Sequence, residues 1–331
     1  MEAALRGGQL DDTALWPARK RDGRPLPGTY AGGLAWKPGR RYDRSGHRRT
    51  NPGYWLMGKA DYRSDIEAIL ARRRDNGADY WTTPDKRLLK GTPFSALNCG
   101  HMLVELGMKP SDPVLKAVAG LFLDAWRDDG RFRLSPQGAI YPCQTISAAN
   151  LLCYLGHAAD KRVQETFEHL LETQHTDGGW RCNKFSFGRG PETGFSNPGP
   201  TLTALDAFRA AGLANETPAL DRAVDFLLGH WTTRKPLGPC HYGIGTLFMQ
   251  VEFPFGGYNL FYFLYILSFY ERARSDRRFA EALRLLQSKL QGGMILVERH
   301  SPRLAGLSFC TKGAVSELAT RRYRDILRNV A

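Results

Sequence analysis

Segments that are apolar at nearly every position alternate along the chain with segments that carry one apolar stripe. Residues 162–174 and 278–290 repeat apolar positions at the spacing of an amphipathic helix, whereas residues 143–155 and 201–211 are small and apolar almost throughout. A helix that is apolar all round is buried on every side, and a helix with one stripe keeps a wet face. The alternation therefore predicts an all-α chain with two classes of helix.

Glycine and proline mark where these helices begin and end, because proline is tolerated in a first turn and glycine after a last one. A longer connection over residues 232–257, rich in Gly, Pro and aromatics, interrupts the series. The expected helices cover residues 66–74, 93–106, 113–127, 143–155, 161–174, 201–211, 220–230, 259–270, 278–290, 311–318 and 321–330.

The order of amphipathic helix, glycine break, aromatic loop and apolar helix recurs about five times, at a period of roughly 50 to 60 residues that is typical of repeat architectures. An open solenoid would not bury one helix of every pair so completely. We therefore expect residues 61–331 to form a closed α/α toroid, with apolar helices inside and amphipathic helices outside. Residues 1–60 have no helical period and several Arg clusters, so we expect an irregular basic arm.

Composition narrows the possible partners and location. The 331 residues carry a net charge of +13, which is either a solvated basic surface, the more usual meaning of such charge, or an attraction for anionic partners such as diphosphates, nucleic acid or lipid headgroups. No nucleic-acid-binding motif accompanies the charge. No apolar run reaches the length of about 18 residues that a membrane span requires. The six cysteines are scattered and the start lacks the form of a secretory signal, so we expect a cytoplasmic protein.

One repeat is better formed than the others. Gln174, Asp177, Gly178, Gly179 and Trp180 are followed by an apolar helix after residue 197. This pattern resembles the repeat of the prenyltransferase and squalene-oxidase superfamily, which includes terpene cyclases and protein prenyltransferase β subunits. The resemblance covers residues 62–330 in repeat order, with weaker copies at 74–81 and 127–130.

The resemblance implies an α/α toroid that acts on an isoprenoid chain, or binds one, in a central cavity. The implied partner is a hydrophobic small molecule or an isoprenoid diphosphate. However, the Asp-x-Asp-Asp acid motif of cyclases, the aspartate pairs that bind magnesium diphosphate and the Asp-x-Cys zinc motif are all missing. The sequence therefore leaves open whether the protein is an enzyme, which would be a transferase or cyclase of the isoprenoid class.

A second candidate chemistry comes from cysteines at one end of the expected barrel. Cys143 begins an inner helix, while Cys182, Cys240 and His241 lie in loops at the same end. Thiolates with a histidine form a plausible first shell for zinc, so we predict that these side chains meet. The alternative is that they are small buried core residues, as expected for Cys99 and Cys153.

Other side chains at this end could bind or react with a ligand. Glu252 stands in an apolar setting that would raise its pKa, and His175 and Asp177 flank the strongest turn, so these are the catalytic candidates. The alternatives are a buried paired Glu, a helix-end His and an Asp that only shapes the turn. Aromatic residues are candidate walls for an apolar ligand or simply core packing; they are Tyr141, Trp180, Phe185, Phe195, Tyr242, Tyr258 and Phe309.

Two further classes of function remain open. A carbohydrate-active α/α barrel would use a pair of carboxylates and tryptophan platforms. A non-catalytic toroid would bind a protein or peptide and fill its centre with its own side chains. Fold alone does not decide among these classes.

Overall fold

The computed structural model describes residues 61–331, and the expected basic arm over residues 1–60 lies outside them. The described part is mostly helical, as the hydrophobic pattern predicts. Its α-helices are α1 Arg63–Ala71, α2 Ala96–Glu105, α3 Pro113–Asp124, α4 Pro142–Tyr154, α5 Lys161–Glu172, α6 Pro198–Ala210, α7 Pro218–Thr233, α8 Thr246–Met249, α9 Leu260–Leu267, α10 Glu271–Arg274, α11 Arg277–Gln287 and α12 Glu317–Val330. Short 3-10 turns are η2 Pro191–Gly194, η3 Pro302–Leu304 and η4 Ser308–Cys310, and the strands β1 Leu290–Gln291 and β2 Met294–Ile295 pair antiparallel.

The helix starts follow from capping chemistry. The side chains of Asp112, Asp160, Thr217 and Asp276 accept a hydrogen bond from the second amide of the following helix. Such a cap satisfies one of the amides that a first turn leaves unpaired. Helices α3, α4, α6 and α7 also carry proline in their first turn, where its missing N–H costs nothing.

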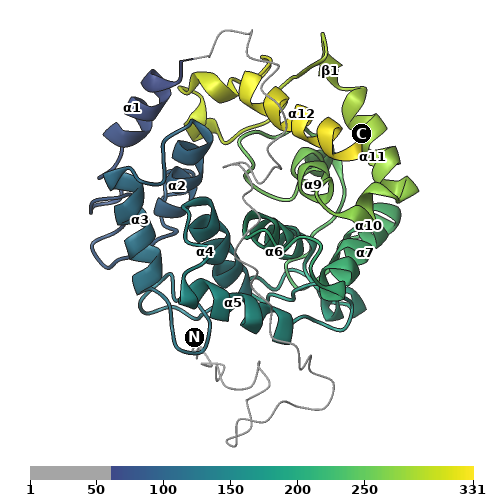
Figure 1. Ribbon diagram of the computed structural model, residues 1–331, viewed down its shortest axis with the longest axis horizontal. Coiled ribbons are helices and arrows are strands. Elements are labelled where there is room, and N and C mark those ends of the chain that lie inside the picture. The colour runs from purple at the N-terminus through teal and green to yellow at the C-terminus, as the bar shows by residue number, and fades with distance from the viewer. Residues whose placement is uncertain (1–60) are drawn as a thin grey trace, which may run out of the picture. The chain divides into compact units, whose positions relative to one another are not determined.

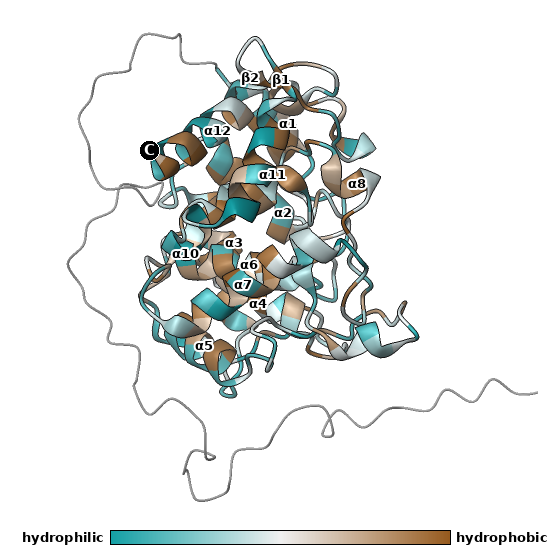
Figure 2. Ribbon diagram, turned by 90° about the vertical axis from the view of Figure 1, so that its right-hand side faces the viewer, coloured by the Kyte–Doolittle hydropathy of each residue, from teal (hydrophilic) through white to brown (hydrophobic). Residues whose placement is uncertain are grey.

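The two classes of helix are present. Every residue of α9 is buried, as is most of α4 and α6, whereas α5 and α11 bury only one stripe. In Figure 2, α11 correspondingly carries both hydrophilic and hydrophobic residues. Helices α4 and α6 pack against each other, and α6 also packs against α7 and α9.

Two of the aromatic loops are each tied to the helix before them by a buried tryptophan. Trp180 Nε1 donates to the carbonyl of Leu170 at 2.8 Å, and Trp81 Nε1 donates to the carbonyl of Ile69 at 3.2 Å. Gln174 adds a clamp, because its amide nitrogen donates to Gly178 O and Ala219 O at 2.6 and 2.7 Å. Gln174 and Trp180 therefore hold the turn at Gly178 between α5 and the start of α7.

The end of the chain contacts its first described helix. Asp65 in α1 accepts hydrogen bonds from Ser308 N, Ser308 Oγ and Phe309 N at 2.8, 2.8 and 2.9 Å. Arg322 in α12 also forms an ion pair with Glu105 at the end of α2. Figure 1 shows the same relation, with the yellow C-terminal segment beside α1 and α2.

The structure corrects the expected helix over residues 311–318. This segment is a turn, with Gly313 at a φ of +79° and Val315 bridged to Leu296, and α12 begins only at Glu317. The hairpin of β1 and β2, turning at Gly292 and Gly293, was expected only as a break. Within residues 61–331 there is no helix with the length and apolar character to cross a membrane.

Candidate functional site

Three cysteines from separate segments meet where α4 and α6 begin. Cys143 is the second residue of α4, Cys182 follows the buried Trp180, and Cys240 lies in the loop after α7. Asn197, the N-terminal cap residue of α6, holds the segment that carries Trp180 and Cys182. Its Oδ1 accepts from Cys182 N at 2.5 Å, and its own N–H donates to Trp180 O at 3.0 Å.

The thiols form a row with Cys182 in the middle. Cys182 is hydrogen-bonded to both Cys143 and Cys240, and Cys240 Sγ also lies 3.3 Å from Cys182 O. A backbone N–H near each thiol acts to lower the pKa of that thiol; these groups belong to Gln144 for Cys143, Lys184 for Cys182 and Phe185 for Cys240. We refer to these three side chains as the thiol row.

The hydrogen bonds give the members of the row different acidities. The contact from Cys182 lowers the pKa of Cys143 against the effect of burial, and Lys184 acts in the same direction. The same contact raises the pKa of Cys182 to about 11, and the contact with Cys182 raises the pKa of Cys240. Cys143, at a helix N-terminus, is therefore the member that ionises first.

Aromatic and imidazole groups continue the site away from the thiols. Tyr242 interacts electrostatically with all three cysteines, and burial raises the pKa of its hydroxyl. Gly199 in α6 makes room for this ring, since a Cβ there would lie 2.6 Å from Tyr242 Cε1. Tyr258 stands edge-on to Tyr242, with ring centres 6.0 Å apart, and its hydroxyl lies 2.8 Å from His230 Nδ1.

His230 is a site residue that sequence reasoning missed. It is 1% exposed near the end of α7, and its Nε2 lies 2.9 Å from Lys235 O. Burial lowers its pKa to about 4, so the imidazole is neutral at pH 7. The only signal in the sequence is that this histidine lies on the apolar stripe of a helix. A histidine in such a position is more often a packed core residue than a functional one.

The predicted metal set is thus brought together in part. His241 adjoins Cys240, but its side chain is 42% exposed and its Nε2 lies 4.0 Å from Glu192 Oε1. In the described part of the chain, no group of three or more His, Cys, Asp or Glu side chains is placed as a metal-binding group.

Asp177 and His175 occupy the turn before α6. The Asp177 carboxylate accepts from Gly179 N at 3.1 Å, Ser196 N at 2.7 Å and Ser196 Oγ at 2.6 Å, and His175 Nδ1 lies 3.1 Å away. Burial opposes ionisation, but these hydrogen bonds lower the pKa of Asp177. This carboxylate therefore shapes the turn and anchors the start of α6.

Glu252 lies elsewhere, in an ion pair with Arg299. Burial raises its pKa more than Arg299 lowers it. Within residues 61–331, no hydrogen bond or ion pair joins Glu252 to His175 or Asp177. The structure therefore does not gather the catalytic candidates into one cluster.

The aromatic candidates fall into three settings. Trp180 and Phe309 are 1% and 3% exposed and belong to the core, whereas Phe185 and Phe195 are 49% and 45% exposed. Tyr141 precedes α4 beside Cys143, and Tyr242 and Tyr258 border the thiol row. Phe255 contacts four rings of the core; they are Phe253, Phe261, Tyr262 and Tyr265.

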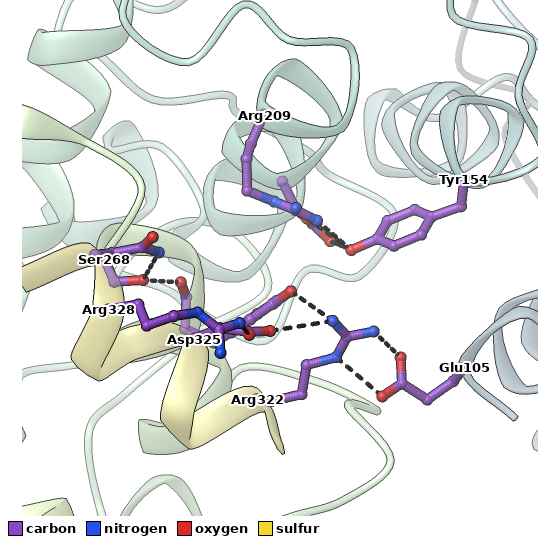
Figure 3. A network of polar contacts seen from close by, with 10 residues as sticks. Glu105, Tyr154, Arg209, Ser268, Arg322, Asp325 and Arg328 are labelled. Carbon is purple, nitrogen blue, oxygen red and sulfur yellow. Dashed lines mark hydrogen bonds and ion pairs between the residues drawn. The ribbon is translucent and has the colours of Figure 1, made fainter. Parts of the chain in front are cut away.

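A buried polar network lies near the C-terminal ends of α2, α4 and α6, and sequence reasoning missed it (Figure 3). Asp206 accepts from Tyr262 OH at 2.8 Å, Tyr154 OH at 3.0 Å and Arg209 Nη2 at 2.6 Å. Burial acts to raise the pKa of Asp206, but Arg209 and the hydrogen bonds lower it. The sequence signal was an Asp and an Arg three residues apart in an otherwise apolar helix.

The network extends to α12 through charged pairs. Arg322 Nε donates to Glu105 Oε1 at 2.9 Å, and Arg322 Nη1 lies 3.3 Å from Asp325 Oδ2. Close by, burial lowers the pKa of His101 to about 4, against the attraction of Asp206 and Glu105. Because each arginine faces carboxylates, the network is largely balanced in charge, and its residues come from five helices, α2, α4, α6, α9 and α12.

Comparison with known proteins identified no related protein: no family model, curated protein or solved structure matches this chain. The functional argument therefore rests on the residues and their contacts.

Proposed function

We propose that residues 61–331 form an α/α toroid of the prenyltransferase and squalene-oxidase type. The alternation of fully buried and amphipathic helices supports this arrangement, and so do the tryptophan anchors at Ile69 and Leu170. The hydrogen bonds from Asp65 to Ser308 and Phe309 join the two ends of the series. On this proposal α4, α6 and α9 are inner helices.

The proposed activity is the binding and conversion of a hydrophobic molecule at a thiol-centred site. The leading candidate for this molecule is an isoprenoid or its diphosphate. The observation that carries this proposal is the thiol row, in which Cys143, Cys182 and Cys240 come together from three separate segments and Cys240 Sγ lies 3.3 Å from Cys182 O. The pKa of Cys143 is lowered by its contact with Cys182, and a lowered thiol pKa is typical of a reactive or metal-binding cysteine rather than of a packing one. The aromatic rings of Tyr242 and Tyr258 supply an adjoining apolar wall.

Zinc suits the donor set, because three thiolates are soft ligands. The zinc ligands would be Cys143, Cys182 and Cys240. His241 could join them only if its side chain moved away from Glu192. Zinc with three protein ligands keeps a coordination position for water or a substrate thiol. Around it, Asn197 orients the Cys182 segment and Lys184 adds positive charge beside Cys143.

Elemental analysis tests whether the thiol row binds zinc. Protein purified without chelators is expected to carry close to one zinc per chain, and Cys182→Ser is expected to lose most of it because Cys182 contacts both other thiols. Cys99→Ala is the matched control, since Cys99 is fully buried in α2. Less than roughly a tenth of an equivalent in the unaltered protein would remove zinc from the proposal.

Organic extraction of the purified protein tests whether it binds a hydrophobic molecule. An isoprenoid or similar lipid is expected in the extract by mass spectrometry, and a Tyr242→Ala variant should retain less of it. A non-catalytic toroid is the second candidate, favoured by the network around Asp206 and Arg322, which occupies interior space with the protein's own side chains. An extract without lipid, from protein that also lacks metal, would support that candidate instead.

A further inference from the structure

Four arginines line one pocket formed by α7 and α11, away from the thiols. The pocket has a volume of about 460 Å³ and is lined by Arg234, Arg277, Arg278 and Arg284, together with Trp231 and Glu281. We call it the arginine pocket. Figure 2 shows α7 and α11 on the face that is turned toward the viewer.

Charge in the arginine pocket is only partly compensated. Arg234 Nη2 lies 3.9 Å from Glu281 Oε1, and Arg278 pairs with Asp276 at 2.7 Å. Among the described residues, Arg277 and Arg284 form no ion pair, and both are exposed. Four arginines against Glu281 and the Asp276 that pairs with Arg278 leave an excess of two positive charges at the pocket.

Three of these arginines stand where local preference disfavours them. Arg277 and Arg278 open α11, although the helix dipole favours acidic residues in a first turn. Arg234 ends α7 in the left-handed conformation, with a φ of 55°, where glycine is the usual residue. Departures from local preference are expected at functional sites, where the rest of the fold offsets their cost.

Two of the guanidinium groups are held in place before any ligand arrives. Asp276 accepts from Arg278 Nε at 2.9 Å and from Nη2 at 2.7 Å, and the remaining N–H donors of that group stay available. The Arg234 guanidinium carbon lies 5.0 Å from the centre of the buried Trp231 ring. Fixed guanidinium groups lose less entropy on binding, and their planar donors match phosphate oxygens in pairs.

We infer that the arginine pocket binds a small molecule that carries a diphosphate group. Its volume is in the range of small-molecule pockets, and its excess charge matches two adjacent phosphates better than one carboxylate. The position of Arg234 is fixed by its backbone, because its carbonyl accepts from Ile244 N at 3.0 Å. The inference stands without the proposed function, because no thiol lines the pocket.

Calorimetric titration of the full chain with inorganic pyrophosphate at low salt tests the inference. We expect binding that weakens as salt rises, and orthophosphate and sulfate should bind at least about tenfold more weakly because they make fewer charge-assisted bonds. The double variant Arg277→Ala with Arg284→Ala should weaken pyrophosphate binding by more than about tenfold. The matched control is Arg321→Ala with Arg324→Ala, which removes the same charge from exposed positions of α12.

Arg277→Glu separates loss of binding from loss of folding. An acidic residue at the first position of α11 is favoured by the helix dipole, so the thermal midpoint should hold or rise while pyrophosphate binding disappears. Unaltered protein that binds no pyrophosphate would overturn the inference. So would equal weakening in the two double variants, or orthophosphate binding as tightly as pyrophosphate.

Discussion

Removing the Asp65 carboxylate tests how the two ends of the helical series are joined. In Asp65→Ala, Ser308 N, Ser308 Oγ and Phe309 N lose their acceptor, and the position is only 3% exposed in the folded protein. A buried donor left without a partner costs about 1–3 kcal/mol, and a part-buried donor less. We expect the free energy of unfolding to fall by about 3 kcal/mol, which lowers the melting temperature by roughly 6–12 °C for a domain of this size.

Urea unfolding followed by far-ultraviolet circular dichroism measures this change. Asp61→Ala is the control, since it removes a carboxylate whose ion pair with Arg63 is exposed, and its midpoint should match that of the unaltered protein. If Asp65→Ala unfolds at the same urea concentration as the control, the contact between α1 and η4 contributes nothing and the reasoning about closure fails.

Three further changes test other parts of the structure. Arg322→Ala leaves Glu105 without its ion-pair partner and should lower the free energy of unfolding by about 3 kcal/mol, measured in urea. The folded pKa of His230, about 4, lies below the ordinary 6.5, so the unfolded chain binds the proton first. The contribution of His230 to stability should therefore be full above about pH 6.5 and fall by about 3 kcal/mol toward pH 4. His101, whose pKa is also lowered to about 4, acts in the same direction, so His230→Gln should make the decline in unfolding experiments shallower by the His230 part alone. Gly199→Ala places a Cβ 2.6 Å from Tyr242 Cε1 and should reduce lipid and zinc content by displacing that ring while circular dichroism stays helical.

The helical class and most helix starts could be predicted because they depend on local chemistry. Pro142 and Pro218 stand in first turns, and Asp112 caps α3 through its side chain, as their positions in the sequence indicate. Residues 311–318 were predicted wrongly because their apolar spacing suits a helix, whereas Gly313 turns the chain and Val315 pairs with Leu296. That pairing is a tertiary contact, which no local pattern encodes.

The candidate site could likewise be predicted from the sequence only where local chemistry determines it. Cys143, Cys182 and Cys240 have no regular spacing, and their meeting was predicted from the order of the repeats rather than from a motif. Asp177 was correctly weighed as a turn residue, because an Asp-Gly sequence is turn chemistry. The partners of Asp206 come from α4, α6 and α9, so the sequence showed the charged residue but not its network.

X-ray absorption at the zinc edge, on protein purified without chelators, tests the thiol-centred site most directly. The account predicts three sulfur neighbours at about 2.3 Å and one lighter neighbour, with the sulfur signal lost in Cys182→Ser. A shell of nitrogen and oxygen alone, or zinc content that does not depend on Cys182, would contradict it.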